Sequence, residues 1–435
     1  MADKISIFWH RRDLRLQDNV GLQKALESDY PVLPVFIFDK HILDPLPEDD
    51  ARVSFIYEEL QKIRHHLQDH QNTSLAIYYG YPKEIFKQLL VDHDVDTIYT
   101  NGDYEPYAIQ RDQDIKELAS SFSVDFKAYK DQVVFHPTEV QKKSGGYYLV
   151  FTPYMRQWKE VFKNYDFNIA TSENHLDNLY KNKRLPNVEL NDMGFKKSPI
   201  KVPDYDLSKS LLNNYDDTRD IPSMEGTSRL SPHLRFGTVG YRQVVQKALE
   251  AEDKTYLNEL IWREFYKAIL YHFPETPEKS FKPEYDQIEW RNDETEFERW
   301  KNGTTGYPIV DAGMRQLNNT GWMHNRLRMI TGSFLCKHLL IDWRWGERYF
   351  AEKLIDFEQS SNVGGWQWVA GSGVDAAPYF RVFNPWTQTD RFDKDKKFIK
   401  YWLPEFDTDD YPQPMVDHKM ARERCLSTYK AAVKK

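Results

Sequence analysis

The chain has 435 residues, of which 40% are apolar and 29% are charged, so it can bury substantial cores and is not a disordered polypeptide. Its formal net charge of −8 argues, taken alone, against a nucleic-acid partner, although a local basic surface can override the total. Cys336 and Cys425 are the only cysteines, which excludes a disulfide framework and favours a reducing compartment. No signal-peptide pattern and no apolar run of membrane-spanning length is present, so we expect a cytoplasmic protein without a membrane partner.

The first third of the chain alternates short apolar runs with amphipathic stretches. We expect strands at residues 5–9, 32–38, 74–79 and 97–100, and helices at 52–68 and 82–93. This order predicts a doubly wound parallel sheet, a Rossmann-like α/β domain. No glycine-rich phosphate loop follows the first predicted strand.

The periodicity blurs after about residue 135, where prolines, asparagines and the Gly145-Gly146 pair indicate a long connector. No convincing series of strands returns beyond it. Helices are expected at residues 257–270, 311–318, 322–340 and 346–355. We therefore predict an α/β domain at 1–134, a connector at 135–205 and a helical domain at 206–435.

Two of these helices carry rows of polar and aromatic side chains beside their apolar stripes. The first row consists of Glu259, Trp262, Arg263 and Tyr266, and the second of Trp322, Asn325, Arg326 and Met329. Asparagine and arginine suit base edges and phosphates. The alternative is an ordinary surface row with one half-buried tryptophan, and methionine as core filler.

Two further stretches are irregular. In GTSRLSPHLRFG (226–237), Thr227, Ser228 and Ser231 precede a predicted helix start at Pro232, where hydroxyl and backbone N–H groups bind anions or simply cap the helix. Residues 360–385, SSNVGGWQWVAGSGVDAAPYFRVFNP, show no helical or strand period. They spell G-x-G-x-x-A without the strand and helix that a dinucleotide fingerprint requires. Histidine spacing predicts no metal site, and no G-x-S-x-G hydrolase elbow is present.

Six stretches together resemble the photolyase/cryptochrome family, and most closely its class I cyclobutane pyrimidine dimer photolyases. They are FWHRRDLRLQDN, GTSRLSPHLRFG, LNELIWREFY, TGYPIVDAGMRQLNNTGWMHNRLRMITGSFL, LIDWRWGERYF and GGWQWVAGSGVDAAPYFRVFNP, and the resemblance covers nearly the whole chain. It implies a helical domain that binds FAD, and light-driven repair of UV-damaged DNA. In this reaction reduced FAD passes an electron to a flipped-out pyrimidine dimer, the dimer splits and the electron returns. The alternative within the family is a cryptochrome-type blue-light photoreceptor with little or no repair.

The resemblance also assigns roles to individual residues. The residues expected to bind FAD are Tyr215, Thr227, Ser228, Arg229, Leu230, Ser231, Arg263, Arg328, Asp356, Glu358 and Asn362. The residues expected to contact the lesion or its flanking phosphates are Arg219, Glu259, Trp262, Asn325, Arg326, Met329, Trp368 and Arg381. Electron transfer to the flavin is expected through Trp366, Trp343 and Trp290, while Glu259 and Asn362 act at the dimer and at flavin N5.

Some positions refine or depart from the family pattern. Plant cryptochromes typically place Asp, and insect ones Cys, where this chain has Asn362, which favours repair. Glu358 stands where the family usually has Asp, Val363 where a second Asn is common, and Trp386 where a smaller residue is found. Glu105 resembles a folate contact of some members, so the second chromophore could be folate, a deazaflavin, another flavin or none. We expect a monomer.

Overall fold

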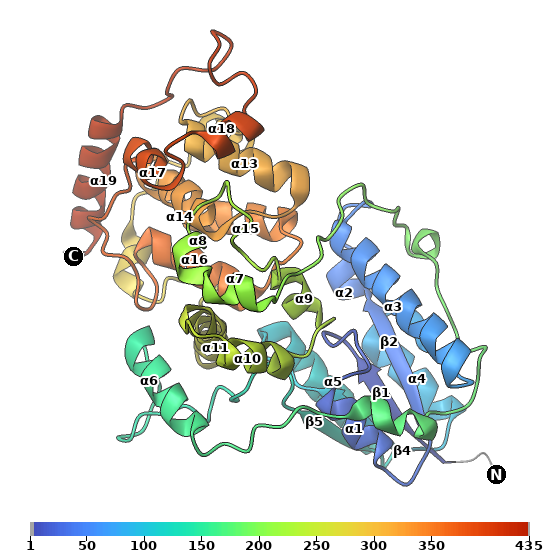
Figure 1. The fold of residues 1–435 in the computed structure, drawn as a ribbon. Helices are drawn as coiled ribbons and strands as arrows, with labels where there is room; N and C mark the ends of the chain where they lie inside the picture. The colour runs from blue at the N-terminus through green and yellow to red at the C-terminus, as the bar shows by residue number, and fades with distance from the viewer. Residues whose placement is uncertain (1–3, 434–435) are drawn as a thin grey trace. The chain divides into compact units, whose positions relative to one another are not determined.

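The computed structural model describes residues 4–433 (Figure 1). These form two compact units, each built from more than one segment of the chain. The first unit comprises Met1–Val140, Trp158–Tyr205 and Leu230–Glu250, and the second comprises Gln141–Gln157, Asp206–Arg229 and Ala251–Lys435. Residues 135–205 include the helix α6 (Phe151–Phe162) and two 3₁₀ turns, Ser172–Asn178 and Leu190–Met193.

The first unit contains a parallel sheet of five strands in the order β3-β2-β1-β4-β5. The strands are β1 (Ile5–His10), β2 (Val32–Asp39), β3 (Ala76–Gly80), β4 (Val95–Asn101) and β5 (Asp125–Tyr129). The helices are α1 (Val20–Leu26), α2 (Lys40–Leu43), α3 (Ala51–His70), α4 (Pro82–Asp92), α5 (Pro106–Ser121), α9 (Ser231–Phe236) and α10 (Tyr241–Glu250). The prediction of a doubly wound parallel sheet is confirmed.

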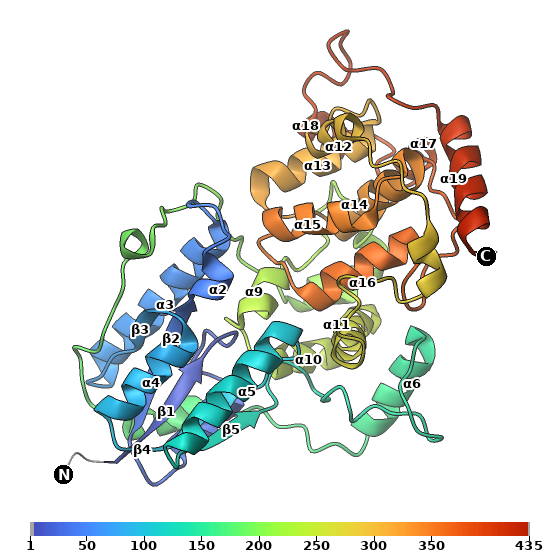
Figure 2. The same ribbon diagram turned by 180° about the vertical axis from the view of Figure 1, so that it is seen from behind.

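Alternate residues of β1 point to opposite faces of the sheet and enter separate cores. Phe8 packs with Leu22 of α1 and Leu60 of α3, whereas Trp9 packs on the other side with Phe86 of α4. Figure 1 shows α3 in front of the sheet, and Figure 2, from behind, shows α4 and α5 in front of it. The four predicted strands are confirmed, while β5 escaped prediction because it is a short, largely exposed edge strand.

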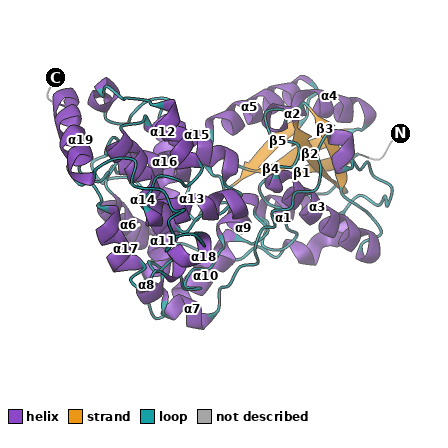
Figure 3. Ribbon diagram, turned by 90° about the horizontal axis from the view of Figure 1, so that it is seen from above, coloured by secondary structure: helices purple, strands orange, loops and turns teal. Residues whose placement is uncertain are grey.

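The second unit consists of helices and loops, and no strand lies among its described residues (Figure 3). Its helices are α7 (Lys209–Asn213), α8 (Tyr215–Thr218), α11 (Thr255–His272), α12 (Glu294–Lys301), α13 (Pro308–Thr320), α14 (Asn325–Ser333), α15 (Trp343–Lys353), α16 (Gln359–Ala370), α17 (Pro385–Phe392), α18 (Lys397–Trp402) and α19 (His418–Val433). A 3₁₀ turn covers Pro283–Gln287, and a π-helix, Phe334–Leu339, continues α14. Buried side chains from α12 to α16 form the main core of this unit.

Two local predictions in this unit are wrong. Residues 360–385 do not lack regular structure throughout, since α16 covers the first part of this stretch. The helical period is hidden because Gly364 and Gly365 interrupt it and buried residues lie on several sides of the helix. The helix predicted from Trp322 begins instead at Asn325, where the imidazole of His324 accepts the Arg326 N–H at 3.1 Å and caps it. Within residues 4–433, no helix combines the length and apolarity needed to cross a bilayer.

Candidate active site

The row predicted on α11 lies beside the start of α16, against which α11 packs. Leu260 and Ile261 of α11 are buried, whereas Glu259, Trp262 and Arg263 remain partly exposed. The amphipathic pattern of α11 therefore divides a packing face from a face that can meet a ligand.

Two buried carboxylates stand just before α16. Asp356 accepts a hydrogen bond from Arg328 at 2.7 Å, and Arg328 also donates to the Met323 carbonyl at 2.8 Å. Glu358 lies 2.8 Å from the Lys267 ammonium and 3.2 Å from the Arg263 guanidinium. Both carboxylates are therefore charge-compensated, as buried charges must be. Lys267, only 1% exposed, places a cation where the longer Glu358 side chain can reach it.

Asn362 lies one turn into α16 and is oriented by α15. Its amide nitrogen donates to the carbonyl of Glu347 at 3.1 Å and to the Glu347 carboxyl at 2.9 Å. Burial raises the pKa of Glu347. A side chain added at Gly365, one turn further on, would meet nothing within 4 Å, so the helix surface beside Asn362 is open.

Glu259 and Arg219 form an ion pair at 2.6 Å. Burial alone would lower the pKa of Arg219, but the Glu259 carboxylate outweighs this and raises it. Arg326 pairs with Asp220 at 2.7 Å, and its guanidinium lies 4.3 Å from the centre of the Phe392 ring. Arg219 and Arg326 are thus held by acidic partners in this structure.

The aromatic and sulfur-containing side chains predicted to meet the lesion have distinct surroundings. Trp262 stacks on Phe151 with ring centres 3.8 Å apart. Met329 and Trp368 are half-buried against the main core. Asn325 is exposed at the start of α14, and Arg381 is exposed in the loop after α16. The Arg381 carbonyl accepts a hydrogen bond from the buried Lys337 ammonium at 2.9 Å.

The three tryptophans predicted to carry electrons differ in exposure. Trp366 and Trp343 are buried in the main core, at 4% and 1% exposure, whereas Trp290 is half-buried at its edge. A side chain added at Gly346 would overlap the Trp366 ring, so glycine is required for this packing. Trp366 also contacts Trp300, with ring centres 6.1 Å apart.

The predicted phosphate-binding loop begins in the second unit. Ser228 accepts a hydrogen bond from the Tyr256 hydroxyl at 2.9 Å, and the Tyr256 ring meets Tyr215 edge-on at 4.9 Å. Arg229 adopts a left-handed conformation with φ of 52°, and Leu230 follows with φ of −77° and ψ of −16°. Thr227 is half-buried and Ser231, the first residue of α9, is exposed.

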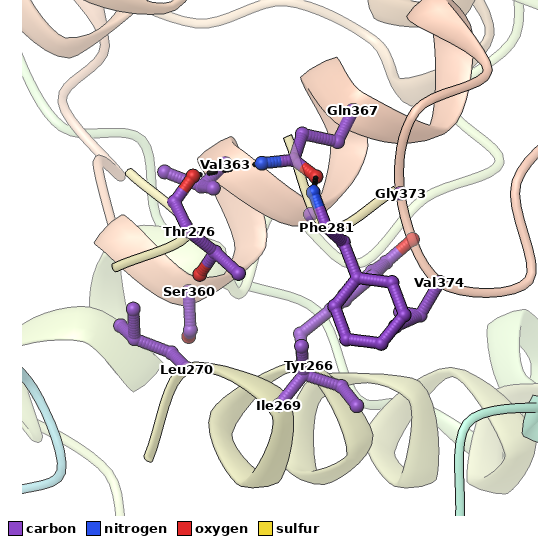
Figure 4. Close-up of a pocket in the computed structure, with 11 residues that line it drawn as sticks. Tyr266, Ile269, Leu270, Thr276, Phe281, Ser360, Val363, Gln367, Gly373 and Val374 are labelled. Carbon is purple, nitrogen blue, oxygen red and sulfur yellow. Dashed lines mark hydrogen bonds between the residues drawn. The ribbon is translucent and has the colours of Figure 1, made fainter. Parts of the chain in front are cut away.

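A small cavity lies between α11 and α16, and Gly373 and Val374 contribute to its lining (Figure 4). Its volume of about 20 Å³ suffices for one water molecule and excludes a ring system. At its edge Gln367, between the two tryptophans of the WQW motif, accepts the Phe281 N–H at 2.9 Å and donates to the Thr276 carbonyl at 2.7 Å (Figure 4). Gln367 therefore ties α16 to residues 276–281.

Comparison with known proteins identifies the family. Residues 6–174 match the family described as DNA photolyase, and residues 256–409 match the FAD binding domain of DNA photolyase. A curated deoxyribodipyrimidine photo-lyase of Halobacterium salinarum is 35% identical over 98% of this chain and 99% of its own length. The chain belongs to the DNA photolyase family.

Two solved structures of photolyases are similar throughout. A bacterial class III photolyase from Agrobacterium tumefaciens matches with a TM-score of 0.88 and 33% identity, over 100% of this chain and 99% of its own. An archaeal photolyase from Sulfolobus tokodaii, solved with two FAD molecules, matches with a TM-score of 0.82 and 34% identity, over 98% and 99%.

The residues at α16 fit the FAD that this photolyase domain binds. An isoalloxazine ring has carbonyl oxygens, a ring N–H and the reactive N5 along its polar edges. Asp356, Glu358, Arg263 and Asn362 offer carboxylate, guanidinium and amide groups of matching kind, and the open surface at Gly365 leaves room beside them.

The remaining expectations concern a second chromophore and metals. Glu105, the possible folate contact, already accepts from Arg12 at 3.0 Å and lies 3.4 Å from Arg235. No cluster of three or more metal-ligating side chains occurs among residues 4–433.

Sequence reasoning missed several residues that contact the candidate site. These are Phe151, Asp220, Tyr256, Lys267 and Glu347. Lys267 lies one turn beyond Arg263, so helical spacing could have suggested it. Asp220 directly follows Arg219 and Tyr256 lies one turn before Glu259 on α11, whereas Phe151 and Glu347 come from distant segments whose contacts no local pattern predicts.

Proposed function

We propose that this protein is a deoxyribodipyrimidine photo-lyase, which binds UV-damaged DNA and splits cyclobutane pyrimidine dimers under blue light. The observation that carries the proposal is the pairing of α11, with Glu259 and Trp262, against the start of α16, with Asn362 and two buried carboxylates. Full-length relatives of this name support it. FAD, when bound, supplies the light-absorbing and electron-donating chemistry.

Trp262 and Trp368 would bind the lesion, and Glu259 would stabilise the charge that it gains. The indole rings form flat walls, and stacking on such a ring stabilises a flipped-out base by about 1–3 kcal/mol. Flipping costs less for a damaged pair, which contributes to selectivity. When Arg219 turns to a DNA phosphate, Glu259 loses its ion-pair partner and its carboxyl group can hydrogen-bond the pyrimidine carbonyl that gains charge.

Four side chains serve the flavin in this proposal. Trp366, Trp343 and Trp290 would supply electrons to bound FAD, because indole is among the most readily oxidised side chains. The Asn362 amide donates both of its hydrogens to Glu347, so its carbonyl oxygen would be left to accept a hydrogen bond from bound FAD.

Repair under light tests the proposal directly. Reduced, FAD-loaded protein is mixed with a dimer-containing oligonucleotide and illuminated with blue light, and intact dimers are counted against a dark control. Loss of dimers in the light alone supports the proposal. Persistence of dimers with an intact flavin contradicts it and favours a photoreceptor, for which a light-dependent binding partner would then be sought.

We also propose that the protein acts as a monomer in the cytoplasm. Its two cysteines, Cys336 and Cys425, are buried free thiols, which suits a reducing compartment. Light scattering on the FAD-loaded protein should give a mass near 52 kDa, since the chain alone accounts for 51.8 kDa.

The absorption spectrum of chromophores extracted from denatured protein identifies any second pigment in the α/β unit.

A further inference from the structure

Trp262 shows only part of its ring to solvent, because Phe151 covers one face of the indole. The ring centres are 3.8 Å apart and the planes differ by 9°, so the two rings are stacked. Phe265 meets both rings edge-on, at 5.6 Å from Trp262 and 6.0 Å from Phe151. Phe151 is 8% exposed while Trp262 stays half-buried, so a base can reach only the surface that these two phenylalanines leave.

A second contact holds the same segment against α11. Tyr147 stacks on His272 at the end of α11, with ring centres 3.4 Å apart. Residues 147–151, called the strap below, thus run along α11 from its last turn back to Trp262. Gly145 and Gly146 precede the strap with φ of 84° and 81°, in a turn where the Gly145 N–H donates to the Lys142 carbonyl at 2.9 Å and the Lys142 N–H to the Gly146 carbonyl at 3.1 Å.

The far end of the strap is fixed by a residue from a distant loop. The Phe151 N–H, the first of α6, donates to the Asp375 carboxylate at 3.1 Å. A helix cannot satisfy its own first N–H groups, so this carboxylate serves as a cap delivered from another segment. Asp375 has φ of 45°, which non-glycine residues rarely adopt, and it lies in the loop that also carries Arg381.

We propose that Phe151 is a positioning residue for lesion recognition: it fixes the plane of Trp262, and Asp375 ties this stack to the loop that carries Arg381. The inference rests on the proposed function, because it assumes that Trp262 contacts the flipped-out dimer. It adds that the stack of Phe151 on Trp262 determines how strongly dimer-containing DNA is preferred over undamaged DNA. A loosely held indole would lose orientational freedom on binding the dimer. This entropy loss would reduce the preference for dimer-containing DNA.

The test replaces the ring of Phe151 while keeping its bulk. Phe151→Leu should lower the ratio of affinities for dimer-containing and undamaged oligonucleotides by about tenfold, the scale of one base-stacking interaction. Phe151→Tyr keeps the stack and should restore the wild-type ratio. Val150→Ala, at a 46% exposed strap position, is the matched control and should change nothing. Affinities are measured in the dark by fluorescence anisotropy on FAD-loaded protein.

A measurement without DNA tests the position of the Trp262 ring independently of the proposed function. In protein labelled with 5-fluorotryptophan, the ¹⁹F resonance assigned through Trp262→Phe should shift in Phe151→Leu and stay in place in Phe151→Tyr and Val150→Ala. Asp375→Asn, which keeps the size of the cap and removes its charge, should shift the same resonance.

An unshifted resonance in Phe151→Leu, or an affinity ratio within about twofold of wild type, overturns the inference. Equal effects of Phe151→Leu and Val150→Ala overturn it too. If the resonance shifts as expected but wild-type protein does not prefer dimers, the proposed function is wrong, while the role of Phe151 in positioning Trp262 is supported.

Discussion

At the scale of single residues, the Glu259–Arg219 ion pair lies on the face of α11 that we propose to bind the lesion. The carboxylate accepts a hydrogen bond from the guanidinium at 2.6 Å, so each group neutralises the charge of the other. Glu259→Gln keeps the size of the side chain and frees Arg219 for a phosphate. We expect the repair yield per absorbed photon to fall about tenfold or more, while the dark dissociation constant changes less than about threefold.

Arg219→Gln is the matched control for this prediction. It should weaken DNA binding and reduce the slope of log affinity against log salt by about one, because one phosphate contact is lost. The yield per bound dimer should stay near that of wild type. Equal losses of affinity and yield in Glu259→Gln would contradict a charge-stabilising role for Glu259.

Trp290 offers a second test at this scale, since it is the half-buried member of the tryptophan series while Trp343 is 1% exposed. Trp290→Phe removes the easily oxidised ring nearest to solvent. We expect photoreduction of oxidised FAD to be largely lost. It is measured from the FAD absorption during blue illumination in the presence of an external thiol. Dimer repair by chemically pre-reduced protein should persist. Photoreduction at the wild-type rate would show that electrons enter elsewhere, and Trp300, which contacts Trp366, would be the next residue to replace.

At the scale of elements, α16 carries two adjacent glycines that face different surroundings. A side chain at Gly364 would overlap the Tyr266 ring of α11, which in turn lies 5.5 Å from Trp262 between ring centres. Gly364→Ala should therefore force α11 and α16 apart, destabilise the protein by about 1–3 kcal/mol, and lower affinity for dimer-containing DNA. Thermal denaturation and dark binding assays measure the two effects.

Gly365→Ala is the contrasting substitution on the same helix. Its added methyl group would meet nothing within 4 Å in the protein, and alanine favours a helix over glycine by about 1 kcal/mol. We expect FAD-free protein to be as stable as wild type or more so, and FAD retention to fall because the methyl group occupies space beside Asn362. Unchanged FAD retention would show that the ring does not approach this surface.

The sequence predicts the core elements better than it predicts the contacts between them. The parallel strands and α11 follow from periodicity, because burial of one face leaves a clear pattern. In contrast, α16 shows no period, since Gly364 packs closely against Tyr266 and polar Ser360 and Gln367 are among its buried residues. Glu347 and Asp375 contact the site across the fold, and only the tertiary structure brings these residues to Asn362 and Phe151. Motifs in the sequence can therefore indicate candidate site residues, but only the structure identifies the residues that they contact.

At the scale of the whole molecule, buried histidines make stability depend on pH. Burial lowers the pKa of His338 to about 3, aided by the neighbouring His418, Arg424 and Lys337, and burial lowers the pKa of His324 to about 4. The folded protein keeps both rings neutral at pH values where an unfolded chain, with a histidine pKa near 6.5, binds protons. Stability is therefore fully present above about pH 6.5 and is lost as the pH falls toward these lower values.

Between pH 7 and pH 5 each of these histidines should lower the free energy of unfolding by about 2 kcal/mol, since about 1.5 pH units lie between pH 5 and the histidine pKa of the unfolded chain. The urea midpoint of FAD-free protein should fall over this interval. His338→Gln can preserve the hydrogen bond that joins His338 to His418 at 2.9 Å while removing the titrating ring, so its midpoint should fall less steeply although it starts lower. The comparison uses the slope against pH, which a general loss of packing would leave unchanged. A His338→Gln slope equal to that of wild type would mean that His338 is already accessible to protons in the folded protein.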